Sequence, residues 1–78
     1  MFRQTYAGRP PVEHLDFYRI DDPRELAELG LDDAFAPDRV TLVEWPERAH
    51  DWLPQRRIEV AIEGSGAQPR TVAVTRLP

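Results

Sequence analysis

The sequence predicts an α/β fold in which short strands predominate and one or two short helices connect them. Two apolar runs of strand length, Val12–Phe17 and Val40–Trp45, carry an acid near their C-terminal ends, Asp16 and Glu44. The C-terminal stretch alternates apolar and polar residues on both sides of a glycine-containing turn. Open α/β sheets bind ligands at the carboxyl ends of their strands. The two acids therefore indicate a nucleotide-binding type of fold, placed to hold Mg²⁺ or to orient water.

The composition limits the chain to one small domain and excludes several functions. A domain of 78 residues buries only about 60–65% of its unfolded surface, so its stability is marginal. The absence of Cys excludes disulfides and thiolate metal sites, and the net charge of −4 argues against a broad basic face for nucleic acid. All ten basic residues are Arg, and without Lys a G-x-x-x-x-G-K-[ST] phosphate loop cannot be present. No membrane span or signal-peptide core is found, so we expect a cytoplasmic protein.

The N-terminal residues predict a β-hairpin. Residues 2–6 alternate apolar and polar side chains, and residues 8–11 read Gly-Arg-Pro-Pro, a turn sequence. The prolines prevent a continued ladder, and residues 12–17 then form the returning strand.

A short helix is expected next, over residues 23–29. Asp22 is placed to cap it, with Glu25 three residues later, and Gly30 suits its C-terminal end. Residues 31–35 predict a further turn.

The middle of the chain predicts a buried strand followed by an irregular segment. Val40–Trp45 is a continuous apolar run interrupted only near its end by an acid, which is typical of a central strand. Residues 46–52 are mostly polar, and we expect a helical turn or loop there.

The C-terminal residues predict a second hairpin. Residues 58–63 alternate strictly, which indicates a strand with one wet face, and residues 64–69 form a flexible turn. Residues 71–75 are the returning strand, with Val72 and Val74 expected to face inward.

Asp16 and Glu44 are the candidates for chemistry, and each has a structural alternative. Strand periodicity places His14, Asp16 and Tyr18 on one face. Asp16 either holds Mg²⁺ directly or through water, or it pairs with Arg19 or caps a turn. Glu44 either has a similar Mg²⁺ or water-orienting role, or it forms a salt bridge with a nearby arginine, since an unpaired buried carboxylate is costly.

Other candidates are weaker. Trp45 either stacks on a base or seals the crevice, or it only packs beside the strand end. His14 with Asp16 provides two ligands, whereas a zinc site needs at least three protein ligands. Glu13 and the remaining acids look like caps or solvated faces. The Gly64–Gly66 segment lies between two strands, so no helix N-terminus follows it to cradle a phosphate.

Taken in order, these motifs resemble the TsaE (YjeE) family, P-loop ATPases of bacterial tRNA threonylcarbamoyladenosine synthesis. That family runs H-x-D-[LIF]-Y-R-[LI], D-P-x-E-L, G-[LI], [LI]-[IV]-E-W-[PS]-E, L-P and a terminal hairpin. The corresponding stretches here are His14–Ile20, Asp22–Leu26, Leu29–Leu31, Leu42–Glu47 and Leu53–Pro54. The resemblance covers nearly the whole chain.

The resemblance implies the C-terminal part of a P-loop NTPase-like fold, with residues 1–78 as a single truncated domain. It implies that Asp16 takes the Walker B part and that Glu44 reaches Mg²⁺ near the γ-phosphate, so both are expected to be catalytic and metal-binding. Trp45 is the neighbouring Trp, and Arg70 lies where the family often has a basic residue near the nucleotide. ATP and Mg²⁺ are the implied cofactors. TsaB and TsaD are the implied partners, in a complex that the ATPase is thought to reset between cycles.

In the family, the phosphate loop precedes the strand that corresponds to the one beginning at Phe2. Residues 1–78 do not contain this loop. We therefore expect little or no ATPase activity from the 78 residues alone. We also expect an open sheet edge beside Val40–Glu44 or Val12–Phe17, whereas a closed barrel would argue against a truncated domain. Three hypotheses stand: the C-terminal part of an ATPase subunit, a non-enzymatic interaction module, and an inactive remnant.

Overall fold

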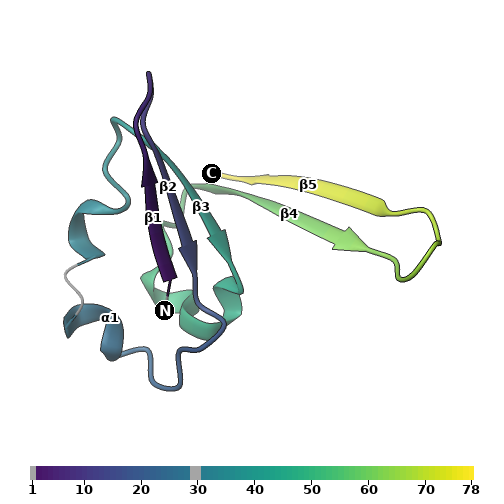
Figure 1. Cartoon of the computed structure of the whole chain (residues 1–78), viewed down its shortest axis with the longest axis horizontal. Helices are drawn as coiled ribbons and strands as arrows, with labels where there is room; N and C mark the ends of the chain where they lie inside the picture. The colour runs from purple at the N-terminus through teal and green to yellow at the C-terminus, as the bar shows by residue number, and fades with distance from the viewer. Residues whose placement is uncertain (1, 29–30) are drawn as a thin grey trace.

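The protein is mixed α/β, as predicted, and consists mostly of strands. The computed structural model describes residues 2–28 and 31–78. Figure 1 shows a body built around one sheet, from which a long hairpin projects. The elements, in chain order, are β1 Phe2–Tyr6, β2 Val12–Asp16, α1 Glu25–Glu28, η1 Leu31–Asp33, β3 Val40–Glu44, η2 Pro46–Trp52, β4 Arg57–Glu63 and β5 Thr71–Leu77.

The body contains a three-stranded sheet in the order β1-β2-β3. Strands β1 and β2 are antiparallel, with Phe2 opposite Asp16, so the predicted N-terminal hairpin is confirmed. Strands β2 and β3 are parallel, with Asp16 opposite Glu44. A parallel pair needs a crossover, and the segment that carries α1 and η1 provides it. This crossover brings two acids that are far apart in the sequence to the same edge of the sheet.

One face of the sheet packs on the hydrophobic core. Along β2, Glu13 and Leu15 are buried, whereas the residues between and beside them are only half-buried. The core is formed by seven fully buried apolar residues, Leu15, Phe17, Ile20, Leu26, Leu31, Ala34 and Ala49. The crossover segment and η2 supply most of these side chains, so they cover the Leu15 face. The opposite face, which carries His14 and Asp16, is left more accessible.

Glu13 is a charged residue on the buried face, and the expectation that it is solvated is wrong. Its side chain is 1% exposed. The Arg3 guanidinium donates to both carboxylate oxygens, at 3.0 and 3.1 Å. Arg39 donates at 3.0 Å and the Thr5 hydroxyl at 3.1 Å. These donors, Arg3 first, hold the pKa of Glu13 below its ordinary value, although burial opposes them.

Strand β3 is an edge strand, and the expectation that it is central is wrong. Within the described part of the chain it pairs only with β2. Val43 packs against the core, but Val40 and Leu42 point to the uncovered face and are 44% and 55% exposed. An apolar run predicts burial on both faces, and here the burial is on one. The predicted open edge beside residues 40–44 is thus present.

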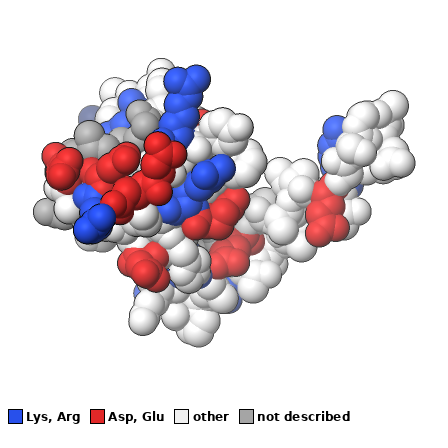
Figure 2. Space-filling model, turned by 90° about the horizontal axis from the view of Figure 1, so that it is seen from below, with Lys and Arg blue, Asp and Glu red and all other residues white. Residues whose placement is uncertain are grey.

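The second hairpin forms as predicted, but its apolar side chains are exposed and do not face inward. Strands β4 and β5 are antiparallel, with Val60 opposite Val74. Figure 2 shows that the hairpin extends away from the body, with mostly uncharged atoms on the side seen in this view. Val72 and Val74, expected to face inward, are 57% and 67% exposed. The reason is that no described element covers the apolar face of the hairpin, which consists of Ile58, Val60, Ile62, Val72 and Val74.

The predicted helix is present but short, since α1 covers only four residues. Asp22 precedes it as expected, and its Oδ1 atom accepts a hydrogen bond from the Arg24 amide at 3.0 Å. The predicted helix end at residues 29 and 30 lies outside the described residues. A single 3₁₀ turn occupies residues 31–33, and two short 3₁₀ segments joined by a kink at Ala49 occupy residues 46–52, in agreement with the two predicted turns. Among the described helices, none has the length and apolarity that crossing a membrane demands.

Candidate functional site

Asp16 and Glu44 are brought together at the carboxyl ends of β2 and β3. They are register partners in the parallel pair, and the Phe17 amide donates to the Glu44 carbonyl at 3.1 Å, which extends the ladder past them. Paired residues in a sheet project to the same face, so both carboxylates lie on the side away from the core. This is the position at which open α/β sheets bind ligands.

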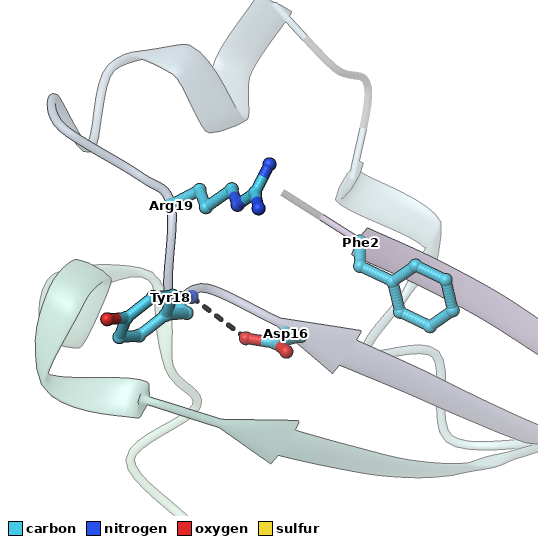
Figure 3. A pocket seen from close by; sticks show the side chains of 4 residues that line it. All are labelled: Phe2, Asp16, Tyr18 and Arg19. Atoms are coloured by element: carbon cyan, nitrogen blue, oxygen red, sulfur yellow. Dashed lines mark hydrogen bonds between the residues drawn. The ribbon is translucent and has the colours of Figure 1, made fainter.

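Asp16 has one oxygen engaged by the backbone. Its Oδ1 atom accepts a hydrogen bond from the Tyr18 amide at 2.9 Å. It therefore caps a turn, whereas the alternative ion pair with Arg19 is not formed within residues 2–28 and 31–78. Figure 3 shows a pocket at this point, lined by Phe2, Asp16, Tyr18 and Arg19. Its volume is about 310 Å³, and Asp16 Oδ2, beside it, accepts no hydrogen bond from the described residues.

Glu44 has one oxygen engaged by a histidine. Its Oε1 atom lies 2.6 Å from His14 Nε2. The predicted alternative was a salt bridge with an arginine, so a partner was correctly expected but its identity was not. The Glu44 side chain is 59% exposed, and its Oε2 atom has no hydrogen-bond partner in the described part of the chain.

An exposed aromatic cluster adjoins the two acids. Trp45 follows Glu44 and has a left-handed backbone, with φ 57° and ψ 49°, which is unusual for a bulky residue. Its ring lies 4.8 Å from that of Tyr18, between centroids. The Arg48 guanidinium lies 5.7 Å from the Tyr18 ring and 6.0 Å from the Trp45 ring. Trp45 and Tyr18 are 44% and 52% exposed, so Trp45 is not simply packed into the core.

Tyr18 and Arg48 were not identified as site residues from the sequence. Tyr18 was placed on the Asp16 face by strand periodicity, although its ring contacts an element far along the chain. Arg48 lies three residues after Trp45, which places it one helical turn away once η2 forms. That spacing was the available signal.

Arg70 is not brought together with Asp16, Glu44 and Trp45. It lies at the turn between β4 and β5, where its guanidinium donates to the carbonyls of Gln68 at 2.8 Å and Gly66 at 3.2 Å. Figure 1 shows this turn at the far end of the projecting hairpin. In this structure Arg70 stabilises its own turn.

The donor set fits Mg²⁺ better than Zn²⁺. Two carboxylates lie at the carboxyl ends of β2 and β3, and one oxygen of each has no hydrogen-bond partner among the residues that the structure describes. Mg²⁺ is usually bound by one or two carboxylates together with waters and phosphate oxygens. Zinc requires at least three protein ligands, and the described residues contain no group of three His, Asp or Glu side chains that could hold a metal. The chain is thus an α/β protein with a carboxylate pair at the C-terminal edge of parallel strands.

The comparison with known families agrees with the resemblance seen in the sequence. The sequence model of the threonylcarbamoyl adenosine biosynthesis protein TsaE matches residues 1–72. The chain therefore belongs to the TsaE family.

Curated relatives carry the same description. The chain is 38% identical over 68 residues to the tRNA threonylcarbamoyladenosine biosynthesis protein TsaE of Bacillus subtilis (strain 168), which covers 87% of this chain and 42% of the relative. It is 40% identical over 52 residues to the Haemophilus influenzae protein of that name, covering 67% of this chain and 33% of the relative. The protein of that name from Rickettsia conorii (strain ATCC VR-613 / Malish 7) is 33% identical over 72 residues, which cover 91% of this chain and 41% of the relative. The chain thus spans about two fifths or less of the length of these three relatives.

Proposed function

We propose that this chain acts in the biosynthesis of tRNA threonylcarbamoyladenosine as the acid-bearing part of an ATP-hydrolysing subunit. The family assignment supports the pathway. The observation that carries the biochemical role is the register pairing of Asp16 and Glu44 at the carboxyl edge of the sheet. A carboxylate pair at that edge suits a Mg²⁺–nucleotide complex.

In the proposed role, each acid contributes its uncommitted oxygen. Asp16 Oδ2 and Glu44 Oε2 would contact the cation directly or through its waters. A bound Mg²⁺ would neutralise charge on the nucleotide phosphates. Trp45, beside Glu44, would shield this edge from solvent or contact the nucleotide. Arg70 would contribute only if the hairpin turn approached the site.

The phosphate cradle is not among these residues, because the chain has no Lys and no G-x-x-x-x-G-K-[ST] sequence. We therefore propose that the chain alone binds nucleotide weakly and hydrolyses little or no ATP. TsaB and TsaD are the proposed partners, and the cytoplasm, where tRNA is modified, is the proposed location.

A Mn²⁺ titration of the 78-residue protein tests this role directly. Mn²⁺ replaces Mg²⁺ as a spectroscopic probe of oxygen-ligand sites. We expect Asp16→Asn and Glu44→Gln each to weaken Mn²⁺ binding by roughly tenfold or more, because the loss of groups that only orient metal ligands already costs about 10- to 100-fold. The matched control is Glu63→Gln, which removes the same charge on β4. Equal affinities in all three variants would refute the site.

A second candidate function is a non-enzymatic interaction module, and the exposed hairpin favours it. The five apolar side chains on one face of β4 and β5 are each more than half exposed. Exposed apolar patches of this kind mark protein–protein contacts. Capture of TsaB and TsaD by the wild-type chain without nucleotide, lost in a Val60→Lys variant, would support this function. Capture that is unaffected by the substitution would argue against the hairpin as the contact, and a chain that neither captures these proteins nor binds Mn²⁺ would be an inactive remnant.

A further inference from the structure

We propose that His14 is a positioning residue that holds the Glu44 carboxylate in one orientation, beside its register partner Asp16. This inference rests on the proposed function, in which the two acids share one cation. It assigns a role to a third residue of the same face, His14, which is half-buried.

The strand register places His14 next to the carboxylate pair. It lies two residues before Asp16 on β2, on the same face, and its register partner on β3 is Leu42. From that position its ring reaches Glu44, and Nε2 lies 2.6 Å from Oε1. A carboxylate only accepts hydrogen bonds, so the Nε2–H group is the donor. The bond fixes one Glu44 oxygen and leaves the other available.

The His14 ring is itself held in place. The Phe2 ring packs against it at 70°, with 6.0 Å between centroids. The His14 side chain is 26% exposed, compared with 59% for Glu44. Each of the three strands thus contributes one side chain in succession: Phe2 from β1, His14 from β2 and Glu44 from β3. Through these contacts, the sheet restricts the conformation of the Glu44 carboxylate, although the Glu44 side chain is mostly exposed to solvent.

The two acids are oriented by different means. Asp16 is short and is fixed by the Tyr18 amide at 2.9 Å. Glu44 is longer and more exposed, so its position depends on a side-chain partner, because rotamer freedom rises with side-chain length. Without the His14 bond, the Glu44 carboxylate would sample several rotamers instead of one. Hydrogen bonds to metal-ligating carboxylates commonly have this orienting role.

His14 is not itself well placed to bind a cation. Its Nε2 atom is hydrogen-bonded to Glu44. Among the described residues, no group of three His, Asp or Glu side chains that could hold a metal ion includes His14. The expected signature is therefore loss of Glu44 order when the donor is removed, and recovery when a different donor replaces it.

The test uses three variants of the full 78-residue chain. His14→Leu removes the donor, and His14→Gln retains an N–H donor at a similar reach. The matched control is His50→Leu, because His50 is the second histidine and lies outside this face. Side-chain scalar couplings of Glu44, measured by NMR, report its rotamer order, and the Mn²⁺ dissociation constant reports its effect on the site.

We expect His14→Leu to average the Glu44 couplings and to weaken Mn²⁺ binding roughly tenfold. His14→Gln should restore both to within about threefold of wild type, and His50→Leu should leave both unchanged. Retention of a single Glu44 rotamer in His14→Leu, or equal losses in the Leu and Gln variants, would overturn the inference. If His14→Leu does not fold, His14→Asn, whose amide is too short to reach Glu44, replaces it.

Failure of the proposed function has a different outcome. A wild-type chain whose Mn²⁺ binding does not depend on Asp16 and Glu44 refutes the cation site. The Glu44 couplings still decide whether His14 orients that carboxylate, because they are measured without metal.

Discussion

Replacing Glu13 with Gln removes the negative charge around which two arginines are arranged. The Glu13 side chain is 1% exposed, whereas those of Arg3 and Arg39 are 26% and 21% exposed. Breaking a fully buried ion pair costs about 3–5 kcal/mol. Because both guanidinium groups still reach solvent, we expect a smaller loss, about 2–3 kcal/mol in the free energy of unfolding.

That loss is large for a domain of this size. A change of 1 kcal/mol shifts the melting temperature by about 4–8 °C in domains of 60–100 residues, so Glu13→Gln should melt roughly 8–24 °C below wild type. Thermal and urea unfolding followed by circular dichroism measure the difference. Glu63→Gln is the control, because it removes the same charge at an exposed position of β4.

The effect should also depend on pH with a defined sign. The Arg3 hydrogen bonds lower the pKa of folded Glu13 below its ordinary value of 4.5. A lowered pKa contributes stability that is present above 4.5 and is lost as the pH falls through the folded pKa. The gap between wild type and Glu13→Gln should therefore be constant near neutral pH and shrink below pH 4.5. A gap under about 0.5 kcal/mol at neutral pH, typical of surface substitutions, or a gap that persists in acid, would refute this reasoning.

Three further predictions concern the other face and the hairpin. Glu44→Ala should change the free energy of unfolding by less than about 1 kcal/mol, because its side chain is exposed and makes one hydrogen bond, to His14, while it abolishes the Mn²⁺ response; equal losses in stability and binding would make Glu44 merely structural. The wild-type chain should self-associate with rising concentration in analytical ultracentrifugation, and the double variant Val60→Thr/Val74→Thr should associate less, whereas Thr75→Ser on the opposite face should behave as wild type. Arg48→Ala should cost about 0.5–1 kcal/mol, the usual strength of an exposed cation–π contact, and should change the tryptophan fluorescence; an unchanged spectrum would show that the guanidinium does not lie over the rings in solution.

Local patterns predicted the elements of this fold well. The turn at residues 8–11 and the strand over residues 58–63 are decided by neighbouring residues, and both were found. The helix after Asp22 was also found, but it begins at Glu25 and not at residue 23. The acids at the ends of the two strands were also recognised, because strand length and position indicate which end of the sheet they occupy.

Features that depend on distant partners could not be predicted in this way. Glu13 was expected to be solvated, because its burial depends on hydrogen bonds from distant arginines. One of these, Arg39, lies 26 residues away in the sequence. The inward facing of Val74 was inferred from alternation, but alternation identifies two faces and does not show what covers either. The same limit applies to His14, whose partner Glu44 is 30 residues away and becomes a neighbour only through the parallel register.

The measurement that most directly tests whether Asp16 and Glu44 form one site is a double-mutant cycle on Mn²⁺ affinity. The cycle compares Asp16→Asn, Glu44→Gln and the double variant with wild type. If the two carboxylates share one cation, the double variant should bind little more weakly than either single variant. Fully additive losses, or no loss in either single variant, would show that the two acids do not act together.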